Sequence, residues 1–438
     1  MEAEKAENES IRFAFQNHID QLDTIPEWWK SFKRRAFDSY SKMPMPARND
    51  ENWRFANRKN LDIDAFDLDA RGKPADSDSL IERSDFTSAQ SGSLIFADNQ
   101  ILKFNRASQE LQDKGVIWCS LQDALIHHDD LLKDYFMKQD IDLGSEKFAH
   151  LHSAFVVNGA LLYVPKGVEI ADPFCSYNWS SAVNGAIFPH TLVIAEEFSK
   201  ASMVEVHLSG GQHPALSCGV THLFAGVGAK IDYTLIQNFN DQTLGFQINS
   251  NIAGQDSEVR MNSVNIGCRH YRSETHGQIK GAGAHVDMRS LALANADQEI
   301  DQRTLQTHSA PHGTSNLLFK NALMQNAKTI FSGLIKVDDC AQQTDAYQTN
   351  RNLLLSNTAE ANSLPGLEIE ANDVKCSHGT TTSEIQEEEI FYMLARGIPK
   401  KTAQELIVYG FFEEILDSIQ DEKLAESARE IIREKFQS

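Results

Sequence analysis

The sequence predicts a mainly β fold, a β-solenoid flanked by helical regions. Three observations lead to this expectation. From about residue 154 to 369, short runs of β-branched and aromatic residues alternate with Gly, Asn, Asp and Ser. Within this region a small residue that opens a strand recurs at nearly constant spacing. Before and after it, apolar residues follow the spacing of amphipathic helices.

The N-terminal region, assigned to residues 1–150, is expected to combine helices with short α/β elements. Apolar residues follow helical spacing in IRFAFQNHIDQL and again in IPEWWKSFKRRAFDSYSKM, which stops before Pro44 and Pro46. The acidic stretch 60–79 is expected to be a surface connection. Further on, GSLIFADNQIL predicts a hairpin-like strand pair, and residues 121–136 predict one helix.

The repeat defines the central region, assigned to residues 151–370. Strands that follow a polar break open at Ala201, Ala229, Ser257, Ala284, Ala327 and Ala359. The steps between these positions are 28, 28, 27, 43 and 32 residues. We interpret the two longer steps as rungs that carry insertions. A β-sandwich is the alternative, because its strands also recur at short spacing, but it predicts no fixed period.

The C-terminal region, assigned to residues 371–438, is predicted to be a helical domain. EEEIFYMLARG carries three acids in its first turn and has Gly397 as a stop. A second helix starts at Pro399, a residue suited to a first helical turn. Its apolar face consists of Leu406, Ile407, Phe411, Ile415 and Ile419. EKLAESAREIIREKF is predicted to form a third helix, and we expect these helices to offer a docking surface at the end of the solenoid.

Composition and charge exclude several classes of function. The chain has 438 residues, of which 41% are hydrophobic and 24% charged, as in folded proteins. Its net charge of −21 repels phosphate backbones, so no nucleic-acid partner is expected. No apolar run is long enough to span a membrane, and the acidic MEAEKAENES resembles no targeting signal. Six scattered cysteines without a CxxC pair are typical of reduced thiols in the cytoplasm.

The sequence lacks three motifs that are typical of hydrolases and kinases. The phosphate-binding pattern GxxxxGK[ST] is absent, because Gly72-Lys73 is followed by proline and lacks the upstream glycine. GxSxG and HExxH are absent as well. We therefore expect a protein that is not an enzyme. A β-helix hydrolase or lyase acting on acidic polysaccharide is the alternative, although no carboxylate pair is evident for it.

Cys376 and His378 are the candidate ligands. Thiolate and imidazole bind soft and borderline metals, and residues two apart on a strand project to the same side. Two ligands do not complete a metal site, so the others would come from elsewhere, such as another chain. The alternative is a buried thiol beside a hydrogen-bonded histidine. For His308 and His312 we expect a structural or interface role, because Pro311 argues against a helix there.

Three segments resemble the SufB/SufD family of scaffolds for iron–sulfur cluster assembly. They are DQRTLQTHSAPHGTSNLLFKN, AQQTDAYQTNRNLLLSNTAEANSLPGLEIEANDVKCSHGTTT and EEEIFYMLARGIPKKTAQELIVYGFF. The resemblance spans about residues 140–420, and RNDENWRFAN also fits. Residues 344–379 are highly specific to the family, and CSHG is similar to its SufD branch. Thr380 stands where alanine is frequent. The 43-residue step contains HSAPHGTSN, so the resemblance makes that long rung a family trait.

The resemblance implies a right-handed parallel β-helix between N- and C-terminal helical domains. It also implies a scaffold that pairs with a SufB-like subunit through the β-helix and binds a SufC-like ATPase through its C-terminal helices. ATP-driven closure of the ATPase would reshape the interface, where the cluster is built. The cluster would be transient in the complex, and no cofactor would be bound stably by the chain alone.

The resemblance also assigns roles to residues. His378 matches the family histidine implicated in cluster assembly, and Cys376 the adjacent cysteine, so His378 is a possible metal ligand shared with the partner chain. The residues expected to contact the ATPase are Phe391, Tyr392, Arg396, Gly397, Ile398 and Phe411. A homodimer of this chain and a purely structural partner without a ligand stay as alternatives.

Overall fold

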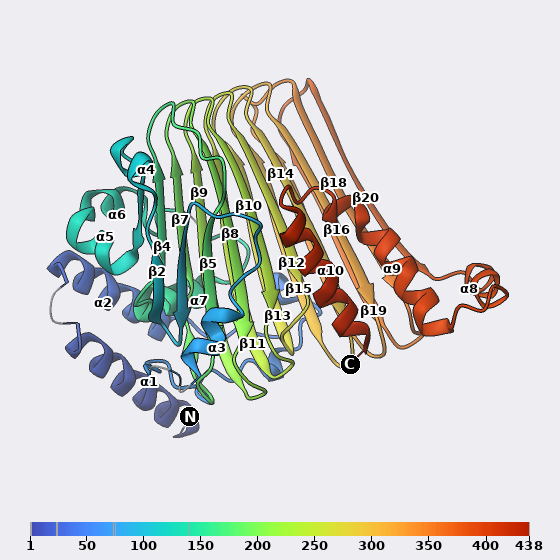
Figure 1. The fold of residues 1–438 in the computed structure, drawn as a ribbon, viewed down its shortest axis with the longest axis horizontal. Coiled ribbons are helices and arrows are strands. Elements are labelled where there is room, and N and C mark those ends of the chain that lie inside the picture. The colour runs from blue at the N-terminus through green and yellow to red at the C-terminus, as the bar shows by residue number, and fades with distance from the viewer. Residues whose placement is uncertain (1, 23–24, 73, 75, 140, 438) are drawn as a thin grey trace.

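The computed structural model describes residues 2–22, 25–72, 74, 76–139 and 141–437. It confirms the predicted parallel β-solenoid, which Figure 1 shows as one long stack of strands with helices from both ends of the chain. From β7 (His190–Ala195) onward, successive strands alternate between two sheets, and each pairs in parallel with the strand one full turn away. The β-sandwich alternative is wrong, because the strands of a sandwich pair in antiparallel hairpins and Greek keys.

Each of the two sheets contains ten strands. The first sheet, in spatial order, consists of β2 (Gln100–Asn105), β1 (Gly92–Ala97), β5 (Phe174–Ser180), β8 (Lys200–Ser209), β10 (Lys230–Asn238), β12 (Glu258–Asn265), β14 (His285–Ala294), β16 (Thr314–Leu323), β18 (Thr344–Leu354) and β20 (Val374–Glu384). The second consists of β19 (Glu360–Ile369), β17 (Lys328–Val337), β15 (Glu299–His308), β13 (His270–Ile279), β11 (Thr243–Ala253), β9 (Ala215–Ala225), β7 (His190–Ala195), β4 (Ala160–Val164) and β3 (Ile117–Ser120), with β6 (Ala186–Ile187) beside β9.

The true repeat is more regular than the sequence suggested. In-register partners in the first sheet lie 27 to 31 residues apart from β8 to β20. Ala284 precedes β14 in the first sheet, whereas Ala327 precedes β17 in the second. The 43-residue step is therefore one and a half turns. The expected insertion, and with it the long rung as a family trait, is wrong, because small residues open strands in both sheets.

Helices cover the outer faces of both sheets. The outward residues Val204 and Val206 of β8 pack in one cluster with Val408 and Phe412. The last two belong to α9 (Lys400–Leu416), which lies with α10 (Glu422–Gln437) in front of the later strands (Figure 1). On the second sheet, α7 (Glu146–Phe155) packs through Phe148, whose ring stacks on Phe246 of β11 at 3.8 Å between centroids.

The N-terminal elements mostly follow the prediction. The predicted helices are α1 (Glu2–Asp20) and α2 (Glu27–Lys42), and the predicted hairpin is the antiparallel pair β1–β2. The single helix expected over 121–136 is instead α5 (Leu121–His127) followed by α6 (Asp129–Tyr135), because His128 leaves helical geometry with φ −141°. The remaining short helices are η1 (Glu51–Trp53), η2 (Arg58–Asn60), α3 (Ser77–Glu82) and α4 (Gln109–Asp113).

The three predicted C-terminal helices are α8 (Glu387–Leu394), α9 and α10. Gly397 has a φ of +81°, in the left-handed region that favours glycine after a helix.

The predicted boundaries at 150/151 and 370/371 fall inside α7 and between β19 and β20, and the division into domains stays a prediction. Lys73 and Ala75 of the expected acidic connection lie outside the described residues. Among the described residues, no helix is long and apolar enough to cross a bilayer.

A buried arginine ties the N-terminal region to the solenoid. Arg272 of β13 is fully buried and forms ion pairs with Asp301 at 2.5 Å and with Glu274 at 2.8 Å. The same guanidinium donates to the carbonyl oxygen of Asn52 and lies 3.9 Å from the ring centroid of Trp53. Because a buried charge is tolerated only where it is paired and hydrogen-bonded, these contacts fix residues 52 and 53 against the second sheet.

We expect Arg272→Met to destabilise the protein by about 3–5 kcal/mol, because Glu274 loses the charge of Arg272 while staying buried. The shift in the urea or thermal midpoint measures the loss. Arg34→Met is the matched control, since the ion pair of Arg34 with Glu27 is exposed, and it should cost no more than about 1 kcal/mol. Equal midpoints for the two variants would contradict the assigned role of Arg272.

Candidate functional site

The solenoid ends in an uncovered rung, formed by β19 and β20, which we call the terminal rung. Within the described part of the chain, β19 and β20 each pair with a strand on one side alone. Their other edges carry unpaired backbone N–H and C=O groups, a ready template for another chain. The apolar side chains of Leu367 and Ile369 on β19 are each 39% exposed. The terminal rung therefore has both the polar and the apolar groups of an interface.

Cys376 and His378 lie on the inward side of β20. Cys376 is in register with Ala346, and His378 with Gln348, both of which are buried on β18. In-register residues of stacked parallel strands face the same way. The inward column that ends at His378 runs through Met203, Tyr233, Met261, Met288, Leu317 and Gln348. The two candidate ligands thus stand at the open mouth of the solenoid interior.

The surroundings of the two side chains differ. Cys376 is half-buried against the apolar cluster of Val337, Ala341 and Ala346. Burial, and to a smaller extent the charge of Asp345, raises the pKa of its thiol, so the thiol is protonated at neutral pH. The side chain of His378 is exposed, and no hydrogen bond or ion pair joins it to any other described residue. Neither side chain is held ready for chemistry in the isolated chain.

No metal site is complete in the described residues. No group of three or more His, Cys, Asp or Glu side chains there could hold an ion. His308, the other histidine considered, is buried on β15 and hydrogen-bonds Ser315 at 2.8 Å, a structural position. Further ligands for Cys376 and His378 would have to come from outside this chain.

Two residues beneath the terminal rung were not singled out from the sequence. Gln348 and Asn350 are buried on β18, in register with His378 and Thr380. Gln348 Oε1 and Asn350 Nδ2 have no hydrogen-bond partner among the described residues. The available signal was the alternation in 346–352, which places Gln348, Asn350 and Asn352 on the face of the apolar Ala346. Polar residues at every second position of a buried strand indicate a polar interior.

The C-terminal residues predicted to contact an ATPase fall into two groups. Phe391 is 72% exposed and Tyr392 59% exposed on α8, which stands away from the stack at its far end (Figure 1). The guanidinium of Arg396 lies 3.4 Å from the ring centroid of Tyr392. Gly397 and Ile398 follow in the turn to α9. Phe411, in contrast, is half-buried and packs on the solenoid, with Lys320 Nζ 5.4 Å from its ring centroid.

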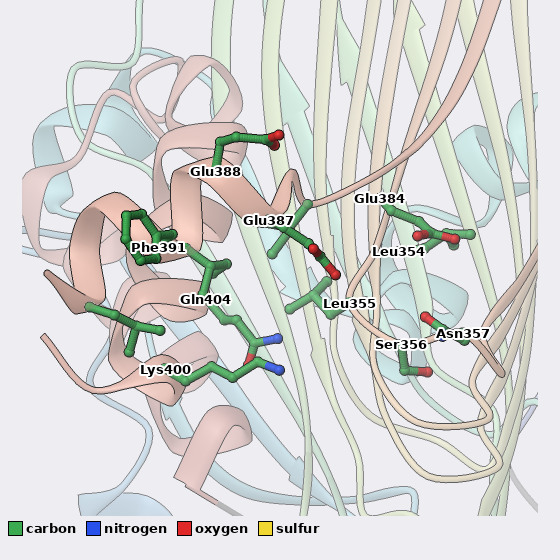
Figure 2. Close-up of a pocket in the computed structure, with 13 residues that line it drawn as sticks. Leu354, Leu355, Ser356, Asn357, Glu384, Glu387, Glu388, Phe391, Lys400 and Gln404 are labelled. Atoms are coloured by element: carbon green, nitrogen blue, oxygen red, sulfur yellow. The ribbon is translucent and has the colours of Figure 1, made fainter.

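A groove separates α8 and α9 from the solenoid. Its volume is about 630 Å³. Figure 2 shows Lys400 and Gln404 of α9 reaching into it toward the turn at Ser356, with Glu387 of α8 above them. Neither Cys376 nor His378 lines this groove, so the groove and the mouth of the interior are different surfaces.

Comparison with known proteins matches both halves of the chain to family models. Residues 9–174 match the model described as the SufBD protein N-terminal region. Residues 178–411 match the SufBD core domain of SUF-system FeS cluster assembly. The chain belongs to the SufBD family. Membership gives it a role in iron–sulfur cluster assembly, in the context of a SUF complex.

Relatives in the SufBD family are similar along nearly the whole chain. The iron–sulfur cluster assembly protein SufD of Bacillus subtilis is 27% identical over 418 residues, covering 94% of each chain. A SufBD family protein of Synechocystis sp. is 28% identical over 401 residues, or 88% of this chain and 86% of the relative. One from Staphylococcus saprophyticus is 25% identical over 416 residues, or 90% and 86%. These likenesses support the predicted resemblance to SufD.

The burial of the cysteines predicts an order of alkylation at neutral pH. Cys340 is exposed and should react first with iodoacetamide, followed more slowly by Cys376, whose raised thiol pKa lowers its thiolate fraction. The four buried thiols should stay unmodified in the folded protein; they are Cys119, Cys175, Cys218 and Cys268. Peptide mass spectrometry over time measures the order, and labelling of Cys376 as fast as that of Cys340 would contradict it.

Proposed function

We propose that this SufBD chain is a non-catalytic scaffold subunit, which contributes Cys376 and His378 to an interface where the cluster is built. The open terminal rung carries this proposal, because it sets both side chains at an uncovered surface. The cluster is the cargo of the complex. It is held transiently between chains, and this chain alone binds no cofactor stably.

The partner at the terminal rung is a SufB-like subunit. Among the described residues, nothing pairs with the outer edges of β19 and β20, so a second solenoid can extend each sheet by backbone hydrogen bonds. Covering the rung also buries Leu367 and Ile369, whose exposed side chains contribute apolar contact. A second copy of this chain is the other candidate for the same edges, and the composition of the purified complex distinguishes the two.

The roles of the two side chains follow from their surroundings. The side chain of His378 is exposed and has no partner among the described residues, so its imidazole is available as a ligand or as a hydrogen-bonding group at the interface. The thiol of Cys376 must lose its proton before it can ligate iron or sulfur, since the thiolate is the ligand form. Positive charge from a partner chain or from the metal stabilises the thiolate of Cys376.

The ATP-dependent step belongs to another chain, a SufC-like ATPase that docks on α8. The exposed rings of Phe391 and Tyr392 lie beside Arg396, a combination of aromatic and arginine side chains that is enriched in interface hot spots.

The polysaccharide-cleaving alternative is not proposed, because the deeply buried carboxylates Glu205, Glu274 and Asp301 are already engaged in internal hydrogen bonds or ion pairs.

We expect His378→Ala to reduce cluster yield by about tenfold or more while the complex still assembles, because loss of a group that supports a metal site typically costs 10–100-fold. The measurement is iron and acid-labile sulfide per complex, purified with the SufB-like and SufC-like partners from cells. Ser377→Ala is the control, since Ser377 is exposed on the opposite face of β20. An unchanged yield in His378→Ala would refute the role of this histidine.

We expect Phe391→Ser to weaken binding of the SufC-like ATPase by about tenfold or more, since burying a phenylalanine side chain contributes about 1.5–3 kcal/mol. Calorimetry or surface plasmon resonance gives the affinity. Phe198→Ser is the matched control, because Phe198 is 60% exposed on a turn of the solenoid before β8.

The chain alone should hydrolyse no ATP in the same preparation. Turnover by the chain alone would overturn the non-catalytic assignment.

A further inference from the structure

Within the residues that the structure describes, the side-chain amide of Gln348 is hydrogen-bonded through its nitrogen but not through its oxygen. Its side chain is 1% exposed, and its Nε2 donates to the carbonyl oxygen of Gly333 on β17 at 3.3 Å. Its Oε1 has no partner among the described residues. An unpaired acceptor that is buried away from water costs stability, so a donor brought within reach of it forms a favourable hydrogen bond.

The orientation of this amide is fixed by Gly333. The carbonyl of Gly333 determines which end of the amide is nitrogen, because two facing acceptors would repel each other. A Cβ on residue 333 would lie 2.5–2.7 Å from the amide atoms of Gln348, so glycine leaves the space that the amide occupies. Oε1 is therefore the end of the amide that stays available to a further residue.

His378 is the donor in the right place. It is the in-register neighbour of Gln348 on the adjacent parallel strand, about 4.8 Å away along the hydrogen-bonding direction. Both residues face the interior of the solenoid. His378 has no polar partner among the described residues, so its ring can change rotamer without breaking a hydrogen bond. A neutral imidazole has one N–H donor and one nitrogen lone pair.

We propose that Gln348 is a positioning residue for His378. When a partner covers the terminal rung and removes water, Gln348 Oε1 accepts a hydrogen bond from one ring N–H of His378. That bond selects one tautomer and orients the ring, which leaves the lone pair of the other nitrogen for the interface. The inference rests on the proposed role of His378, and it makes Gln348 and Gly333 part of the same arrangement.

The test follows the tautomer of His378 in the assembled complex. The chain is labelled with ¹⁵N-histidine, combined with unlabelled SufB-like and SufC-like partners, and sedimented for solid-state NMR of the ring nitrogens. His378→Gln identifies the signals. We expect one dominant tautomer in the wild type and a mixture in Gln348→Leu. Gly333→Ala should give the same mixture, because its methyl group displaces the amide without removing it.

Two further variants separate positioning from packing. Gln306→Leu is the matched control. Gln306 is also 1% exposed, and its Oε1 has no partner in the part of the chain that the structure describes, but it lies on β15 and is not in register with His378. It should leave the tautomer unchanged. Gln348→Glu should restore the single tautomer, because a buried neutral carboxyl can donate to Gly333 and accept from His378.

The outcomes distinguish this inference from the proposed function. Identical tautomer populations in the wild type and Gln348→Leu would overturn the positioning role, whatever the cluster yield. A changed tautomer together with full cluster yield in His378→Ala would uphold the contact and refute the role of His378 in assembly. We expect the changed tautomer and a several-fold loss of iron and sulfide in Gln348→Leu, with neither effect in Gln306→Leu.

Discussion

The parallel stacking of rungs is the constraint on which the rest of the structure depends. Within the stack, a strand such as β10 satisfies its backbone through the strands one turn before and one turn after it, and inward side chains pack on their in-register neighbours. Such a stack has no natural end, because every rung leaves the next edge unpaired. Both the interior column that ends at His378 and the exposed edges of β19 and β20 follow from this single rule.

The sequence was sufficient to predict the solenoid, but not to predict which strands lie one full turn apart. Small residues precede strands in both sheets, so spacing alone could not separate a full turn from a turn and a half at Ala327. The N- and C-terminal helices could be predicted from the sequence, because their apolar residues recur with the period of a helix. The break at His128 depends on one residue's backbone geometry, which propensity does not specify.

The candidate site was partly predictable. Cys376 and His378 were recognisable by residue type and by the family-like motif, and a strand fixes their common side. The residues beneath them were not, because register between strands thirty residues apart is unknown without the fold. The same holds for Arg272, whose partners Asn52 and Trp53 are more than two hundred residues away in the chain. Long-range contacts of this kind leave no local pattern.

The opposite end of the stack has a different character. There, β2 and β3 are antiparallel to their neighbours, only six and four residues long, and α1, α2, α5 and α6 lie around that end of the stack (Figure 1). Such short edges offer a second solenoid less backbone to pair with than β19 and β20 do, which are 10 and 11 residues long. In the proposed pairing at the terminal rung, two solenoids joined at their open ends leave these short, helix-flanked edges facing outward, so the pair closes on itself.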